Sequence, residues 1–176
     1  MRWIWIDRFV SFESGKSATS VKNLSLAEDH FADHIPGYPV MPAALILEGL
    51  AQTGGILVGE ANHFREKVVL AKIPRATFHA EARAGQELAY EATMVTLRAE
   101  GALVEGRVTA DGQLVAEAEI FFAHLDQSRS QQLFGEHNFV FSGELKHLLG
   151  RAKAVADKTE ESGVRGQESA KTAPAQ

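Results

Sequence analysis

Hydrophobic and polar positions along the chain predict one long buried helix framed by strands. From Ala43 to Val58 nearly every position is apolar, which is typical of a helix that is covered on all sides. Pro42 stands where proline is well tolerated, at the first turn of such a helix. Glycines at positions 54, 55 and 59 weaken its predicted C-terminal end.

Strand patterns lie on both sides of this helix. Two precede it, at residues 3–6 and 17–24, with a polar turn at 13–16 between them. Asp111-Gly112 is the strongest hairpin signal, because both residues tolerate positive φ. Strands wrapped on one buried helix predict an α+β fold, an antiparallel sheet whose free edges allow pairing with a second copy. The strands predicted after the helix lie at 68–71, 76–80, 86–97, 103–110 and 114–123.

The chain divides into three parts. Residues 1–126 form the predicted folded domain, and residues 127–156 form a C-terminal extension. Ser142 is a candidate cap for a short amphipathic helix in that extension. Residues 157–176 are polar and charged, and we expect them to be disordered. The apolar positions of the predicted extension helix are Leu145, Leu148, Leu149 and Val155.

The amino-acid composition excludes several classes of function. The chain has 176 residues, of which 45% are hydrophobic, and a formal net charge of -5, so it has no electrostatic footprint for nucleic acid. The absence of cysteine excludes disulfides, thiolate zinc sites and a cysteine nucleophile. The N-terminal apolar run is broken by charge too early for a signal peptide, and no uncharged stretch approaches the roughly 18 residues of a membrane span. We expect a cytoplasmic protein that does not enter a membrane.

Residues 33–52, DHIPGYPVMPAALILEGLAQ, carry the candidate chemistry. His34 stands directly before a proline-rich loop, and Glu48 is a carboxylic acid inside the apolar helix. A carboxylic acid buried without a partner tends to keep its proton at neutral pH, whereas a neutral histidine accepts one. Such a pair is a usual basis for acid–base chemistry. The residues alone leave open that Glu48 faces a polar rim and that His34 is an ordinary loop residue.

The same stretch resembles the signature of β-hydroxyacyl-[acyl-carrier-protein] dehydratases of the Z/A type, in the hot-dog superfamily. A weaker resemblance extends over most of residues 5–125. The chain departs from the family pattern in four places. Ala43 replaces the second glycine of the signature, Ala44 stands where valine is usual, and Ile35 replaces the phenylalanine. The family's Pro-Gly-Asp turn is Ala84-Gly85-Gln86 here. The matching residues, in order and without gaps, are His34, Pro36, Gly37, Pro39, Val40, Met41, Pro42, Glu48, Ala51 and Gln52.

This resemblance implies a hot-dog fold and the dehydration of a 3-hydroxyacyl group, linked as a thioester to acyl carrier protein, in fatty-acid or related lipid biosynthesis. The product is the trans-2-enoyl thioester. His34 is then the general base at C2, and Glu48 is the acid that protonates the departing C3 hydroxyl. Ala43 and Gly37 position the thioester oxygen. The supporting residues are Gln52, which orients the carboxyl of Glu48, together with Val40 and Pro42.

The resemblance also implies that His34 and Glu48 of one site come from different subunits. The expected partners are therefore a second copy, in a homodimer or a trimer of dimers, and acyl carrier protein. No metal and no cofactor is implied. His30 and His34 have a zinc-like spacing for a helix, but Pro36-Gly37 argues against a helix there. The basic side chains at 65, 67, 72 and 75 form either a carrier-protein patch or a solvated face.

Two other functions stay open at this stage. A hot-dog thioesterase uses a carboxylate to activate water or to attack the thioester. A non-catalytic hot-dog protein binds an acyl group or a partner, and the departure at Ala43 leaves room for that role. The spacing from His34 to Glu48 and the Pro-Val-Met-Pro loop favour the dehydratase.

Overall fold

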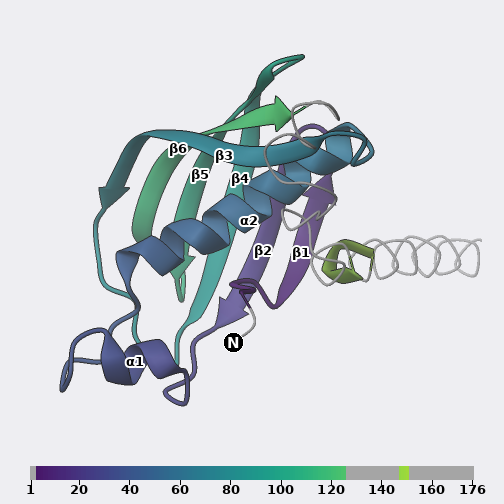
Figure 1. The fold of residues 1–176 in the computed structure, drawn as a ribbon. Coiled ribbons are helices and arrows are strands. Elements are labelled where there is room, and N and C mark those ends of the chain that lie inside the picture. The colour runs from purple at the N-terminus through teal and green to yellow at the C-terminus, as the bar shows by residue number, and fades with distance from the viewer. Residues whose placement is uncertain (1–2, 126–146, 151–176) are drawn as a thin grey trace, which may run out of the picture.

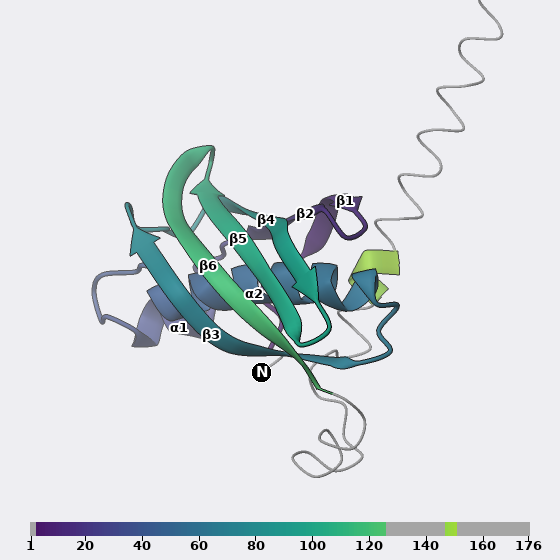
Figure 2. The ribbon, with the colours of Figure 1, turned by 90° about the horizontal axis from the view of Figure 1, so that it is seen from above.

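A computed structural model describes residues 3–125 and 147–150 of the chain. In this part, six antiparallel strands form one curved sheet that wraps around a long helix (Figures 1 and 2). The strand order is β1-β2-β4-β5-β6-β3, which places β1 and β3 at the edges. The predicted α+β fold is therefore confirmed. The elements in chain order are β1 (Arg8–Glu13), β2 (Ser17–Asn23), α1 (Asp29–Asp33), α2 (Ala43–Ala61), β3 (Lys67–Phe78), β4 (Glu87–Arg98), β5 (Gly101–Ala110) and β6 (Gln113–Leu125).

The tight turns follow the local chemistry of the sequence. Asp111 and Gly112 have φ values of 49° and 83°, so both adopt the left-handed conformation that a two-residue hairpin needs. The turn between β1 and β2 contains Gly15 at a φ of 68°. Both turns were predicted, and they pin the register of the hairpins that they close.

Small residues let α2 lie close to the sheet. A Cβ at Gly49 would stand 2.4 Å from a ring carbon of Tyr90, and one at Gly54 would stand 3.2 Å from the ring of Phe122. α2 continues through the glycines that were expected to weaken its C-terminal end, and it ends at Ala61. Close packing of the buried helix against the sheet outweighs the low helix propensity of glycine.

The two halves of α2 differ in burial. Residues 49–60 are all buried, whereas Ala43 and Ala44 are exposed and Leu47 and Glu48 are half-buried. The expectation of a helix covered on all sides is thus wrong for its N-terminal half in the single chain. The first turns are covered on one face only, since Ile46 is 2% exposed while Ala43 and Ala44 face solvent.

The strand predicted at residues 3–6 does not form. The first strand begins at Arg8, and residues 3–6 run along α2 without a strand partner. Gln52 replaces that partner, since its side chain accepts a hydrogen bond from the N–H of Trp5 at 2.8 Å and donates to the carbonyl of Trp3 at 3.1 Å. A side chain here satisfies backbone groups that a sheet would otherwise satisfy.

The two strands predicted at 68–71 and 76–80 form one strand, β3. Its pairing with β6 is irregular between Leu70 and Lys72 and again between Lys72 and Arg75. Pro74 lies within that second irregularity. Proline has no N–H for the ladder, and an edge strand tolerates it.

The C-terminal extension is described only over residues 147–150, which are helical. Leu149 is buried at 4% exposure and belongs to the hydrophobic core. The predicted cap Ser142, the remaining predicted helix and the tail at 157–176 lie outside the described residues. Within the described ranges, no helix combines the length and apolar character needed to cross a membrane.

Candidate active site

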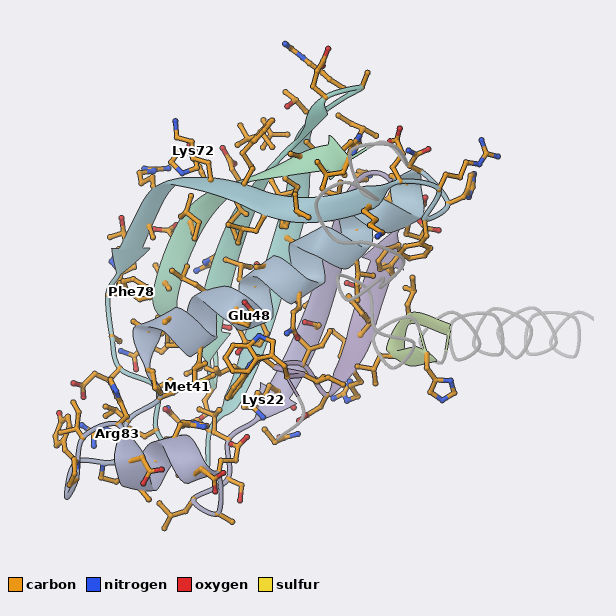
Figure 3. All side chains as sticks on the ribbon, viewed as in Figure 1. Lys22, Met41, Glu48, Lys72, Phe78 and Arg83 are labelled. Atoms are coloured by element: carbon orange, nitrogen blue, oxygen red, sulfur yellow. The ribbon has the colours of Figure 1, made fainter. Side chains whose placement is uncertain are left out.

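Glu48 lies in the N-terminal half of α2 (Figure 3). Two N–H donors hold its carboxyl. The indole Nε1 of Trp3 donates to Oε1 of Glu48 at 3.0 Å. Nε2 of Gln52, one helical turn later, donates to the same oxygen at 2.9 Å. Within the described part of the chain, no hydrogen bond or ion pair reaches Oε2. The carboxyl is thus fixed through one oxygen only.

Gln52 also ties the N-terminal segment to α2. Its amide oxygen and nitrogen bond the backbone of Trp5 and Trp3, and its nitrogen bonds Glu48 as well. Gln52 is itself buried at 9% exposure. One amide therefore fixes both the acid and the chain segment that lies beside the acid.

His34 stands at the end of α1, a helix that the sequence did not predict. Its backbone N–H bonds the carbonyl of His30 at 3.2 Å, and its side chain is exposed. The expectation that Pro36-Gly37 keeps His30 out of a helix is wrong, because α1 ends before the proline. Phe31 anchors this short helix, since it is buried at 3% exposure.

An ion pair between a buried lysine and a half-buried glutamate holds the turn that leads into α1. Nζ of Lys22 lies 2.7 Å from Oε1 of Glu28, and the Lys22 side chain is 8% exposed. The other oxygen of Glu28 accepts a hydrogen bond from the N–H of Ser25 at 3.0 Å. Sequence reasoning missed this pair, because a lysine in a strand and a glutamate in a loop carry no signal that they will meet in the fold.

The proline-rich loop that follows His34 is fixed at several points. Gly37 has a φ of 81°, a conformation that suits glycine. Val40 is buried at 6% exposure and pairs with Arg83 in an isolated bridge, and the N–H of Met41 donates to the carbonyl of Ala82 at 2.8 Å. Figure 3 shows Met41 and Arg83 at the end of the molecule where α2 begins.

Side chains reinforce the same loop. The hydroxyl of Tyr38 donates to Glu81 at 2.7 Å and accepts from Arg83 at 2.7 Å. The Arg83 guanidinium also lies over the ring of Tyr38, 4.7 Å from its centroid. Cation–π contact and hydrogen bonds together hold the loop against the segment before β4.

Ala43 is the first residue of α2, and its side chain is exposed. Pro42 is the N-cap residue, and its carbonyl accepts the N–H of Ile46 at 3.2 Å. The N–H groups of the first helical turn have no partner inside the helix and form its positive end. The N–H of Ala43 is therefore a donor suited to a developing negative charge.

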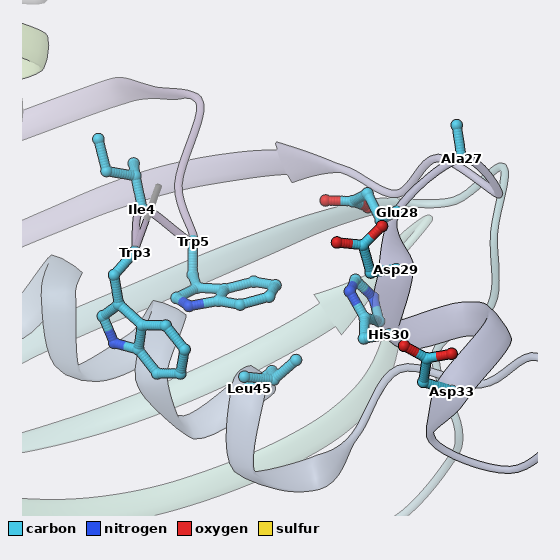
Figure 4. A pocket seen from close by; sticks show the side chains of 9 residues that line it. All are labelled: Trp3, Ile4, Trp5, Ala27, Glu28, Asp29, His30, Asp33 and Leu45. Atoms are coloured by element: carbon cyan, nitrogen blue, oxygen red, sulfur yellow. The ribbon is translucent and has the colours of Figure 1, made fainter. Parts of the chain in front are cut away.

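A cleft of about 350 Å³ lies beside Trp3, between the N-terminal segment, the start of α2 and α1 (Figure 4). Burial lowers the pKa of His30 on its wall below the ordinary value. Trp3 packs edge-on against Trp5, and Trp5 packs against His30, with ring centroids 5.6 Å and 5.4 Å apart. The lining residues are Trp3, Ile4, Trp5, Ala27, Glu28, Asp29, His30, Asp33 and Leu45.

The structure therefore brings Gln52 to Glu48 and adds Trp3, which sequence reasoning did not place in the site. No hydrogen bond joins His34 to Glu48 within the described part of the single chain, and the two lie on different helices. Among residues 3–125 and 147–150, no three acidic or histidine side chains gather as a metal site. Of the four candidate basic side chains, Arg75 pairs with Glu119 at 2.9 Å.

Known sequences resemble this chain over the same region. A family model described as the FabA-like domain matches residues 3–119, which include both His34 and Glu48. The 3-hydroxyacyl-[acyl-carrier-protein] dehydratase FabZ of Listeria welshimeri is 39% identical over 125 residues, covering 70% of this chain and 87% of that protein. The FabZ of Aliarcobacter butzleri is 39% identical over 120 residues, covering 65% of this chain and 82% of that protein.

Solved structures share the fold at low sequence identity. The dehydratase heterocomplex ApeI:P of Xenorhabdus doucetiae matches with a TM-score of 0.62 at 11% identity, covering 76% of this chain and 91% of that one. An uncharacterized protein of Pyrococcus horikoshii matches with a TM-score of 0.58 at 16% identity, covering 72% and 88%. The sheet wrapped on a central helix is the hot-dog fold. The chain belongs to the FabA-like hot-dog family of 3-hydroxyacyl-[acyl-carrier-protein] dehydratases.

Proposed function

We propose that this protein is a hydro-lyase that removes water from 3-hydroxyacyl-[acyl-carrier-protein] in fatty-acid biosynthesis, with His34 and Glu48 as the acid–base pair. The product is the trans-2-enoyl thioester. The observation that carries the proposal is the Glu48 carboxyl, which two N–H donors hold by Oε1 inside the region that matches the family. A carboxyl that is held in one orientation transfers its proton more readily, because it does not have to rotate into place during the reaction.

The chemistry follows from what each group offers. His34, exposed at the end of α1, takes the C2 proton, which is weakly acidic because the thioester stabilises the resulting enolate. Glu48 gives its proton to the departing C3 hydroxyl, so that water leaves and the C2–C3 double bond forms. Each positioned acid or base contributes about 10²–10⁴-fold to the rate.

The negative charge that develops on the thioester oxygen needs a donor in the same place. The N–H of Ala43 at the start of α2 supplies it, and Gly37 shapes the loop that faces it. Alanine keeps the N–H that the family's glycine offers and adds only a methyl group. Val40, Pro42 and Gln52 support this arrangement through the loop bridge, the helix cap and the bond to Glu48.

A second copy of the chain completes each site in this proposal. The edge strand β3 pairs with β6 on one side, and along it Leu70 and Phe78 are 45% and 42% exposed. The exposed first turn of α2 adds further uncovered apolar surface at Ala43 and Ala44. Unpaired strand edges and apolar patches favour association, so we propose a homodimer, alone or as a trimer of dimers. His34 of one copy then faces Glu48 of the other.

Acyl carrier protein is the proposed partner that delivers the substrate, and the cytoplasm is the proposed compartment. Residues 1–126 are the proposed catalytic domain, and residues 127–176 follow it as a C-terminal extension and tail.

One assay tests the reaction and separates it from the alternatives. Purified protein is incubated with a 3-hydroxyacyl carrier-protein thioester while enoyl absorbance and free thiol are followed. Enoyl product without thiol supports the proposal, free thiol indicates a thioesterase, and neither indicates a binding protein. Glu48→Gln is expected to abolish enoyl formation while the circular dichroism spectrum stays unchanged. Full activity in that variant would falsify the role of Glu48 as the acid.

A further inference from the structure

Trp3 contacts the Glu48 carboxyl although the two residues are 45 positions apart in the sequence. We infer that Trp3 is a positioning residue that aims the acid, a role that rests on the dehydration proposed above. Its indole N–H fixes which oxygen of Glu48 carries the reactive proton. Trp3 lies before the first strand, in a segment with no regular structure of its own.

The assignment of the oxygen follows from hydrogen-bond chemistry. An N–H group donates and does not accept, so it bonds a carboxyl oxygen only through a lone pair. Trp3 and Gln52 both donate to Oε1. In the protonated acid Oε1 is therefore the carbonyl oxygen, and the proton is carried by Oε2. Oε2 is then the oxygen that hands the proton to the departing hydroxyl.

Two hydrogen-bond donors restrict the rotation of the Glu48 carboxyl, whereas one donor does not. A single bond from Gln52 leaves the carboxyl free to rotate about that contact. The indole comes from a different element, so the second bond restricts the rotation and fixes the plane of the carboxyl. General acid catalysis depends on this direction, because the proton has to point at the leaving oxygen.

Trp3 is itself held in place. Its carbonyl accepts a hydrogen bond from Gln52 at 3.1 Å, and its ring packs edge-on against Trp5 at an interplanar angle of 86°. The side chain is nevertheless 59% exposed, so it contributes little to the core. An exposed aromatic ring held by two ring contacts and one backbone bond fits a positioning role better than a packing role.

The two tryptophans provide a matched pair of variants. Trp3→Phe and Trp5→Phe each remove one indole N–H, but the Nε1 of Trp5 has no hydrogen-bond partner among the described residues. We expect Trp3→Phe to lower kcat about 10-fold with an unchanged KM, because the Glu48 carboxyl loses its fixed orientation while substrate binding is kept. Trp5→Phe keeps the bond from Trp3 to Glu48 and keeps an aromatic ring beside Trp3, so it is expected to lower kcat clearly less than Trp3→Phe does.

A spectroscopic measurement tests the contact without relying on activity. In the Trp5→Phe protein, Trp3 gives the remaining indole N–H resonance in a ¹H–¹⁵N spectrum. Adding Glu48→Ala removes the acceptor, so that resonance is expected to move upfield and to exchange faster with water.

The outcomes separate this inference from the proposed function. Equal kcat values in the two tryptophan variants would overturn the role of Trp3 and leave the proposed function untouched. An indole resonance that does not change with Glu48→Ala would do the same. A parent protein that forms no enoyl product would overturn both proposals.

Discussion

Replacing Gly49 with alanine tests how α2 is held against the sheet next to Glu48. The added Cβ would lie 2.4, 2.6 and 2.8 Å from three atoms of the Tyr90 side chain. Ordinary carbon contacts are about 3.5–4.0 Å, so the ring or the helix has to move by roughly 1 Å. Tyr90 is fully buried, so its ring moves only if the surrounding core moves with it.

The magnitude follows from two opposing effects. Overpacking a core costs about 1–3 kcal/mol, and a rigid, buried ring favours the upper value. Alanine is better than glycine in a helix by about 1 kcal/mol. The expected net loss is therefore about 2 kcal/mol of the free energy of unfolding. A displaced α2 also misplaces Glu48, so kcat is expected to fall by about 10-fold or more.

Gly55→Ala is the matched control in the same helix. A Cβ at Gly55 would meet the Phe122 ring at 3.4 Å, which is ordinary contact. This variant is expected to gain up to about 1 kcal/mol from helix propensity alone. Urea denaturation of both variants gives the comparison. Equal stability of the two would refute the reasoning, and so would a cost of Gly49→Ala that persists undiminished in a Tyr90→Leu background.

Two further variants test buried groups through the pH dependence of stability. Burial raises the pKa of Tyr90 far above its ordinary value, so above about pH 10 the unfolded chain loses a proton that the folded chain keeps, and stability falls. Tyr90→Phe is expected to remove that alkaline loss in denaturation curves, whereas Tyr38→Phe keeps it; an unchanged loss in Tyr90→Phe would contradict the burial argument. Burial lowers the pKa of His30. Below about pH 6.5 His30 therefore binds a proton in the unfolded chain but not in the folded chain, and the stability of the protein falls as the pH falls. His30→Phe is expected to reduce this acid loss and His63→Asn to leave it, as measured by thermal unfolding between about pH 5 and 7; equal acid sensitivity in both would count against the assignment.

Much of the fold was predictable from local patterns. The hairpin at Asp111-Gly112 and the helix that begins at Ala43 depend on turn chemistry and on a run of apolar residues, and both are confirmed. The errors lie where tertiary contacts override local preference. Residues 3–6 look like a strand, but Gln52 satisfies their backbone. The glycines of α2 carry low helix propensity, and the sequence does not reveal that Gly49 and Gly54 allow the sheet to approach closely.

The candidate site was likewise predictable only where its residues are close in sequence. The motif placed His34, Glu48 and Gln52 in a functional stretch, because those residues are close in sequence. Trp3 and the ion pair of Lys22 with Glu28 carry no local signal, since their roles arise from contacts between segments that the fold brings together. Burial of Glu48 was also overestimated, because in the single chain the sheet leaves the first turns of α2 uncovered.

The most direct measurement is a complementation test for a site shared between two chains. His34→Ala and Glu48→Gln chains, each inactive alone, are mixed in equal amounts, unfolded and refolded together. In a symmetric dimer with shared sites, half of the dimers are mixed and each has one intact site, so about a quarter of the unmodified activity is expected to return. Enoyl formation that stays at the level of the separate variants, although mixed dimers are present, would contradict the account.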